Sequence, residues 1–288
     1  NIIITYIILV LVSITSITPF IWSVLRSLVD FKEAFDEPSL LFIDHWDFTN
    51  YIKVIKGEGL DASFGNFFIN SFIITFNRVL FTIIFATMAG YAFATKTFPG
   101  RDFIFYGILI LMVVPRDATI VPLFVIMRYF PFAGGNNILG EGGMGFVDTY
   151  AGMILPYAVG AFEIFVMRQF FWSMPKELLD SSRVDGANQW QSFIFIAVPY
   201  ALPGIVAVGI FSFQSAWNDY IWPLIITRSV DIQPVQLGLQ TFSSDANQQG
   251  LWGILMAAVI MSTIPMLTVF IIFQKYFFRS ISFEGISK

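Results

Sequence analysis

The sequence has no cysteine, a single histidine and few charged residues. The absence of cysteine excludes disulfides, thiolate metal sites and thiol nucleophiles. With His45 alone, a histidine-rich metal cluster is excluded and a Ser-His-Asp triad has little basis. Charged residues are 12% of the chain, against roughly 25% in soluble domains. The formal net charge of -4 argues against a nucleic-acid partner. Because 56% of the 288 residues are hydrophobic, the composition indicates a polytopic membrane protein.

Long uncharged stretches predict the membrane spans. Residues 1–25, 186–218 and 246–274 carry no charge, and a bilayer core needs about 20 apolar residues in a helix. We therefore expect an all-α polytopic membrane protein that forms a single transmembrane domain over residues 1–288. The six predicted spans are 3–25, 69–94, 103–127, 149–172, 199–222 and 251–274. Pro115 and Pro122 make the third span either one kinked helix or a span followed by a short surface helix.

The distribution of lysine and arginine predicts the orientation of the chain. With both termini in the cytoplasm, the inside connections hold eight basic and five acidic residues, and the outside connections hold seven and fourteen. The external segment 26–66 contains aromatic residues such as Trp46 and Tyr51, which favour a compact packed cap. The external segment 130–148 contains six glycines but no phosphate-binding motif, so we expect a flexible solvent loop.

A charged segment separates the fourth and fifth spans. Pro175 suits the first turn of a helix and Gly186 suits a helix end. Leu178, Leu179 and Val184 alternate with charged residues, which predicts a short amphipathic helix. A second amphipathic stretch runs from residue 190 to 198. A helix–glycine–helix of this kind fits a groove on a soluble partner, although on these grounds alone an ordinary inter-helix loop is the favoured explanation.

The spacing within this segment resembles the signature of permease subunits of ATP-binding-cassette (ABC) importers. That signature, the EAA motif, reads E-A-A, three residues, G, nine residues, I, one residue, L-P. The corresponding residues here are Asp180, Ser181, Ser182, Gly186, Ile196, Val198 and Pro199, and Asp185-Gly186-Ala187 matches the D-G-A common in the family. Asp replaces Glu, two serines replace two alanines, and Val replaces Leu.

The resemblance extends in order along the chain to the carbohydrate branch of these permeases, in particular the maltose-type second subunit. The further similar stretches are residues 19–22 and 27, 70–71 and 89–93, 98–101, 217–220 with 223–224, and 278–285. The resemblance implies a type I importer permease in the bacterial plasma (inner) membrane that transports a carbohydrate, and the expected cargo is an oligosaccharide. Its implied partners are a homologous second permease, two ATP-binding subunits and an external solute-binding protein.

The resemblance also implies that residues 175–199 form cytoplasmic coupling helices that dock on an ATPase. The residues implied for this role are Asp180, Ser181, Ser182, Asp185, Gly186, Ala187, Ile196 and Pro199. The chain itself is then a non-catalytic subunit that binds no cofactor, with ATP and magnesium held by the partner ATPase.

Two ionisable residues at membrane depth are candidates for the substrate pathway, because such residues are rare and often functional. Arg78 could reach the headgroups, pair with an acidic group, for which Glu163 is a testable partner, or face the pathway. Glu163 could be a hydrogen-bonding group in the pathway or the partner of a base on the second permease.

The outer end of the fifth span offers the aromatic and polar side chains that sugar recognition uses. These residues are Gln214, Trp217, Asn218, Asp219 and Tyr220. Tryptophan and tyrosine also gather at membrane interfaces regardless of cargo. Arg116 and Arg128, near the outer face of the third span, could favour an anionic oligosaccharide as the cargo.

Three alternative functions follow from the same sequence. The same architecture could carry a non-sugar solute, such as a polyamine or amino acid, because the cytoplasmic segment does not identify the cargo. An ion-coupled secondary transporter is weakly supported, since no inverted repeat and no paired membrane acids are visible. An intramembrane enzyme has too few candidate catalytic side chains.

Overall fold

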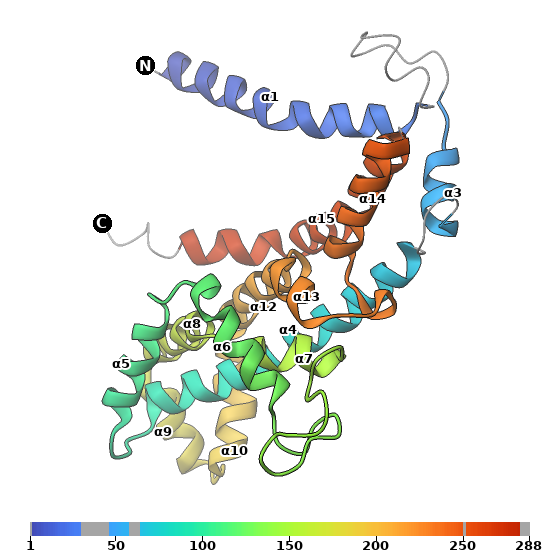
Figure 1. Cartoon of the computed structure of the whole chain (residues 1–288). Helices are drawn as coiled ribbons and strands as arrows, with labels where there is room; N and C mark the ends of the chain where they lie inside the picture. Colours follow the sequence, from blue (N-terminus) through green and yellow to red (C-terminus); the bar gives the residue numbers. More distant parts are fainter. Residues whose placement is uncertain (1, 30–45, 58–63, 250–251, 283–288) are drawn as a thin grey trace. The chain divides into compact units, whose positions relative to one another are not determined.

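The computed structural model describes residues 2–29, 46–57, 64–249 and 252–282 (Figure 1). Within these ranges the regular structure is entirely helical, with no strand. The chain divides into two compact units, residues 1–71 with 233–265 and residues 72–232 with 266–288. The prediction of an all-α fold is confirmed.

The first unit contains α1 (Ile2–Ser27), α3 (Thr49–Lys56), the start of α4 (Phe64–Thr95), α14 (Val235–Gln249) and the first part of α15 (Trp252–Ser282). The short helix α3 packs against the end of α1. Asn50 Nδ2 donates to the carbonyl oxygens of Ser27 and Val29 at 3.1 and 3.0 Å, and the Tyr51 hydroxyl lies 2.7 Å from Ser27 Oγ. The described part of segment 26–66 is therefore partly packed, although Trp46 is exposed. Residues 30–45 and 58–63 of that segment lie outside the described residues.

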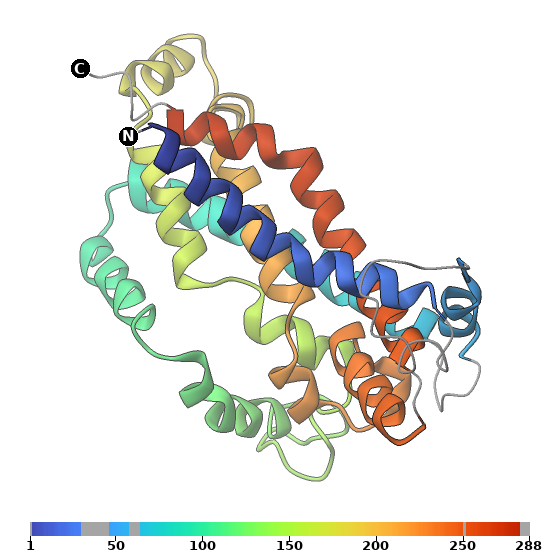
Figure 2. The ribbon, with the colours of Figure 1, turned by 90° about the horizontal axis from the view of Figure 1, so that it is seen from above.

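The second unit begins within α4 and contains the remaining helices. These are α5 (Arg101–Leu111), α6 (Arg116–Arg128), α7 (Tyr150–Ile154), α8 (Ala161–Trp172), α9 (Lys176–Val184), α10 (Gln189–Ser192), α11 (Val198–Tyr200), α12 (Leu202–Trp217) and α13 (Ile221–Ile226). Short 3₁₀ turns occupy Leu155–Tyr157 and Val230–Ile232, and a π-helical turn occupies Phe193–Ala197. In Figure 2, α8 and α12 lie side by side next to α4.

Three helices, Ile2–Ser27, Phe64–Thr95 and the described α15 up to Lys275, are long and apolar enough to cross a membrane without interruption. Three further candidates are bent pairs: α5 with α6 at 107°, Tyr150–Tyr157 with α8 at 45°, and Gln189–Tyr200 with α12 at 74°. The count reaches the six predicted spans if each pair is one span. The third predicted span is broken rather than kinked, because residues 112–115 separate two helices. The fifth ends at Trp217, five residues before the predicted boundary.

Segment 130–148 is a loop, as predicted, and internal hydrogen bonds define its conformation. Asn136 Nδ2 donates to the carbonyl oxygens of Arg128 and Phe130 at 3.0 and 3.1 Å, and its Oδ1 accepts from the Gly143 amide at 2.9 Å. Five of its glycines have positive φ, which glycine adopts without steric cost. At its end, the Asp148 carboxylate accepts from the amides of Arg228 and Ser229 at 2.8 and 2.9 Å.

Candidate functional site

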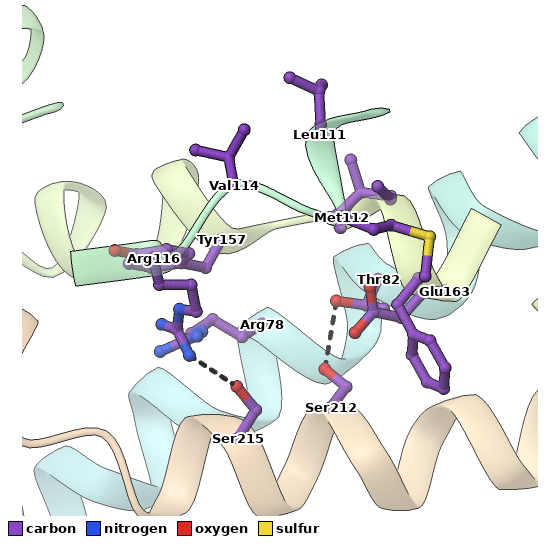
Figure 3. Close-up of a pocket in the computed structure, with 14 residues that line it drawn as sticks. Arg78, Thr82, Leu111, Met112, Val114, Arg116, Tyr157, Glu163, Ser212 and Ser215 are labelled. Atoms are coloured by element: carbon purple, nitrogen blue, oxygen red, sulfur yellow. Dashed lines mark hydrogen bonds between the residues drawn. The ribbon is translucent and has the colours of Figure 1, made fainter. Parts of the chain in front are cut away.

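A cavity of about 430 Å³ lies inside the second unit (Figure 3). It is bounded by α4, α12 and the breaks between α5 and α6 and between α7 and α8. Its volume is in the range of small-molecule sites, about 300–1,000 Å³. Its polar lining residues are Arg78, Thr82, Arg116, Tyr157, Glu163, Ser212 and Ser215.

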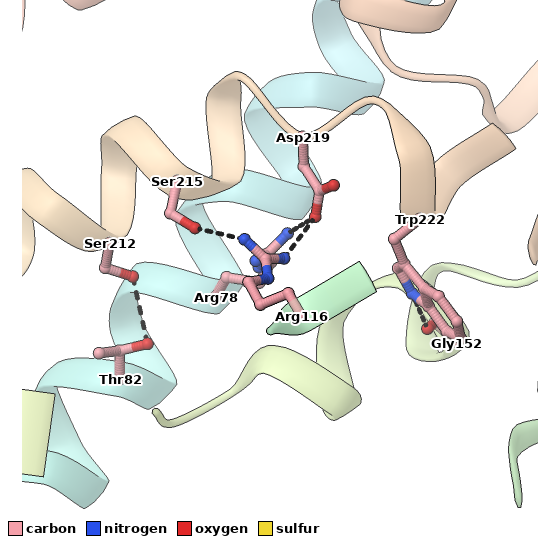
Figure 4. Close-up of polar contacts among 8 residues, drawn as sticks. All are labelled: Arg78, Thr82, Arg116, Gly152, Ser212, Ser215, Asp219 and Trp222. Atoms are coloured by element: carbon pink, nitrogen blue, oxygen red, sulfur yellow. Dashed lines mark hydrogen bonds and ion pairs between the residues drawn. The ribbon is translucent and has the colours of Figure 1, made fainter. Parts of the chain in front are cut away.

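Two arginines and one aspartate form an ionic cluster at one end of this cavity (Figure 4). Arg78 Nη1 donates to Asp219 Oδ2 at 2.7 Å, and Arg116 Nη2 lies 3.4 Å from the same oxygen. Both guanidinium groups also lie over the Tyr157 ring, at 4.9 and 4.3 Å from its centroid. Arg78 is 3% exposed, so it does not reach the headgroups. Its acidic partner is Asp219 and not Glu163, which corrects the pairing considered from the sequence.

Matching polar positions on α4 and α12 place these groups. Buried polar residues recur on α4 at a spacing of three and four, which puts them on one helix face. Facing them are two serines of α12 and an aspartate just beyond the end of α12. The two sets are Thr75, Arg78 and Thr82, and Ser212, Ser215 and Asp219. Ser212 Oγ donates to Thr82 Oγ1 at 3.1 Å, and Arg116 Nη1 donates to Ser215 Oγ at 3.3 Å. Because the cavity lies between these faces, its lining carries hydroxyl groups as well as charges.

Glu163 lies at the other end of the cavity. It is in the first turn of α8, where the helix dipole favours a carboxylate. In Figure 3 it lies beside Thr82, across the cavity from Arg116. Within the described part of the chain, the Glu163 side chain has no hydrogen-bond or ion-pair partner. The described residues also contain no group of three acidic or histidine side chains that could hold a metal ion. Its carboxylate is therefore available as a hydrogen-bond acceptor.

The other predicted pathway residues do not line this cavity. Gln214 and Asn218 are exposed at the end of α12. Trp217 is 1% exposed and packs against Phe72 and Phe213, with ring centroids 5.2 and 5.7 Å away, so it is a core residue. Asp219 contributes through the ionic cluster. Tyr157, Thr82, Ser212 and Ser215 were not among the predicted pathway residues, although the repeated polar positions in otherwise apolar helices are a detectable signal.

The 175–199 segment forms two short helices joined by a glycine turn. Helix α9 begins after Pro175 and ends at Val184, and Gly186 has φ +84°, as predicted for a helix-ending glycine. Ser182 Oγ lies 2.8 Å from Ser192 Oγ, which joins α9 to α10. Asn188 then starts α10 with a capping box. The hydrogen bonds make this segment a defined helical hairpin.

The hairpin has a buried face and an exposed face. Leu179 is buried in one cluster with Phe171, Met174, Ala197 and Ala201, which ties α9 to the ends of α8 and α12. Among the residues matching the family signature, the exposed ones are Asp180, Ser181, Asp185, Gly186 and Pro199. Ser182 is buried, and Ala187 and Ile196 are half-buried. Val184 and Trp190 are 88% and 62% exposed, so the outer face presents apolar side chains.

Comparisons with known proteins place the chain among transport components. Residues 82–283 match the family described as "Binding-protein-dependent transport system inner membrane component". The diacetylchitobiose uptake system permease protein NgcG of Streptomyces coelicolor is 30% identical over 97% of this chain and 87% of its own. The arabinooligosaccharides transport system permease protein AraQ of Halalkalibacterium halodurans is 31% identical over 87% and 81%. The sn-glycerol-3-phosphate transport system permease protein UgpE of Yersinia enterocolitica is 28% identical over 76% and 73%.

A solved structure supports the fold. A chain of a bacterial ABC transporter involved in the import of the acidic polysaccharide alginate superposes with a TM-score of 0.81 at 24% identity, covering 96% of this chain and 95% of that one. The same likeness, at a TM-score of 0.65, 15% identity and coverage of 94% and 92%, is found with a bacterial alginate ABC transporter in complex with alginate pentasaccharide-bound periplasmic protein. At these identities the likeness concerns the fold.

Proposed function

We propose the function of this chain from its family: it belongs to the binding-protein-dependent transport system inner membrane components. It is a multi-pass membrane permease, and its cargo is a carbohydrate. The names of its relatives support this cargo, because two of them are permeases for oligosaccharides, diacetylchitobiose and arabinooligosaccharides. The observation that carries the proposal is the family match over residues 82–283 together with the exposed helical hairpin.

In this proposal the chain forms half of a translocation pore with a homologous second permease. An external solute-binding protein delivers the carbohydrate, and each permease docks one ATPase subunit. ATP and magnesium belong to the ATPase. The hairpin is the docking element, because its outer face exposes Val184 and Trp190 to a partner groove.

Docking couples the nucleotide cycle to the pore through the packing of the hairpin. When two ATPases close around ATP, they displace α9. Because Leu179 is buried against the ends of α8 and α12, these helices must move with it. The pore then changes from inward-open to outward-open.

The complex itself provides the test. The chain is co-expressed with its second permease and ATPases, purified through a tag on this chain, and reconstituted into lipid. We expect the ATPase subunits to co-purify, and we expect ATP hydrolysis to rise when a carbohydrate-loaded binding protein is added. A purified chain without any ATPase, or stimulation by amino-acid-loaded and not by carbohydrate-loaded binding proteins, contradicts the proposal.

The lack of cysteine allows a direct test of orientation. We propose that both termini and the hairpin are cytoplasmic and that segment 130–148 is external. Val184→Cys and Leu139→Cys place single thiols at positions 88% and 75% exposed. A membrane-impermeant maleimide applied to intact cells should label Leu139→Cys and spare Val184→Cys until the membrane is opened and the ATPase subunits are removed. The reverse pattern contradicts the orientation.

A further inference from the structure

The ionic cluster at the cavity has an excess of positive charge. Arg78 and Arg116 share one carboxylate, that of Asp219. The pair Arg78–Asp219 is close and buried, with side chains 4% and 8% exposed. Glu163, which is the acidic residue of the cavity lining, makes no ion pair with either arginine, and Figure 3 draws no contact between them. One of the two guanidinium groups therefore lacks a full counter-charge.

Arg116 is the arginine that remains available. Its side chain is 52% exposed, and its contacts to Ser215 Oγ and Asp219 Oδ2 are 3.3 and 3.4 Å long. Charge-assisted hydrogen bonds are ordinarily about 2.7–2.9 Å long, and a guanidinium has five N–H donors. The Tyr157 ring, 4.3 Å away, holds the group in place without supplying an acceptor. Arg116 can therefore form a bidentate contact with an incoming anion.

The rest of the cavity suits a polyhydroxylated ligand. Thr82, Ser212 and Ser215 supply hydroxyl groups, and the free Glu163 carboxylate can accept hydrogen bonds from a ligand hydroxyl. A small inorganic anion would leave this second end unused, and a neutral sugar would leave Arg116 without an anionic acceptor. A ligand that satisfies both ends carries an acidic group on one side and hydroxyl groups on the other.

We propose that this cavity binds the cargo and that Arg116 recognises a carboxylate on it, so that the transported carbohydrate is an acidic saccharide of the uronate class. This inference rests on the proposed function and names its substrate. Arg116 is separable from the buried pair, because its removal leaves the 2.7 Å contact between Arg78 and Asp219 in place.

The test measures binding of defined saccharides to the intact transporter complex in lipid nanodiscs, without the binding protein. The probes are the trisaccharides of galacturonate, glucuronate and mannuronate, the same trisaccharides with their carboxylates reduced to alcohols, and sn-glycerol 3-phosphate. The variants are Arg116→Gln, Arg116→Lys and the control Arg228→Gln. Arg228 is exposed and outside the cavity lining, so this control removes the same charge elsewhere.

We expect at least one uronate trisaccharide to bind more tightly than its reduced form. Arg116→Gln should weaken that binding by about 10- to 100-fold, the loss expected for a hydrogen-bonded charge. It should leave the reduced form unaffected, Arg116→Lys should retain part of the preference, and Arg228→Gln should retain all of it.

Three results overturn the inference while the proposed function stands. These are equal binding of acidic and reduced forms, equal loss of both in Arg116→Gln, and tighter binding of sn-glycerol 3-phosphate than of every uronate. If no saccharide binds and no carbohydrate-loaded binding protein stimulates ATP hydrolysis, the proposed function has failed as well.

Discussion

Substitutions at Gly186 test whether the hairpin needs a particular backbone conformation or a particular amount of space. Gly186 has φ +84°, and a Cβ built on it has no heavy atom of the described chain within 4 Å. A side chain there therefore meets no steric obstacle within the chain. Its cost has two candidate sources, which are the left-handed backbone and the groove of the proposed partner ATPase.

The two sources predict different orders of severity. A left-handed conformation costs an L-residue about 1–2 kcal/mol, less for Asn, and it is a marked outlier for a β-branched residue. Backbone strain alone therefore ranks the loss as Asn, then Ala, then Val. Obstruction of the groove instead ranks the loss by the size of the side chain, so that Ala has the mildest effect. Because the position is exposed and free, we expect the strain order, with a loss of about 5- to 30-fold in coupled transport for Ala.

Coupled transport in proteoliposomes, as sugar imported per ATP hydrolysed, measures the effect. Size-exclusion chromatography of each variant complex separates loss of docking from loss of coupling. We expect Gly186→Val to retain a complex, assembled or weakly docked, that no longer transports. Normal transport by Gly186→Val refutes the reasoning, and a severity order that follows side-chain size assigns the effect to the groove instead.

Two further predictions concern the ionic groups. Arg78→Leu should destabilise the purified complex by about 3–5 kcal/mol, because it leaves Asp219 buried without its main partner. The double variant Arg78→Leu with Asp219→Leu should recover part of the lost stability. Unchanged thermal unfolding of the single variant contradicts the assigned pair. Burial acts to raise the pKa of Asp148, but hydrogen bonds from Arg228 and Ser229 outweigh burial and lower the pKa below the ordinary 3.8. The ionised Asp148 therefore stabilises the folded protein fully above that value, and this stabilisation is lost as the pH falls through the folded-state pKa. Wild type should consequently lose more thermal stability than Asp148→Asn on acidification from about pH 6 to pH 3, and parallel profiles contradict this.

Features encoded by neighbouring residues were predictable from the sequence. Uncharged stretches located the helices because a bilayer core excludes charge. Pro175 and Gly186 located both ends of α9, since each acts on its own backbone. The breaks beside Pro115 and Gly160 were harder to predict, because proline and glycine permit a bend without fixing its angle.

Features that depend on distant residues were not predictable in the same way. Arg78 and Asp219 are 141 positions apart, and only the packing of α4 against α12 brings them together. From the sequence, a tryptophan such as Trp217 is equally compatible with the membrane interface and with the protein core. Its contact with Phe72 shows that it belongs to the core. The order in segment 130–148 comes from side-chain amides such as Asn136 that bond to the backbone of the same loop.

The cavity and the hairpin are joined by the same two helices. Helix α8 begins near Glu163 at the cavity and ends at Trp172, just before the hairpin, and α12 starts after the hairpin and carries Ser212 to the cavity. The two helices are closely packed, since a Cβ on Gly204 would lie 2.5 Å from the Phe170 ring. Nine residues of helix span about 14 Å, so a displacement at one end of α8 reaches the other as a rigid-body movement. In the proposed function, ligand contacts at Glu163 and partner contacts at α9 would therefore act on one packed element, which is the physical connection that coupled import requires.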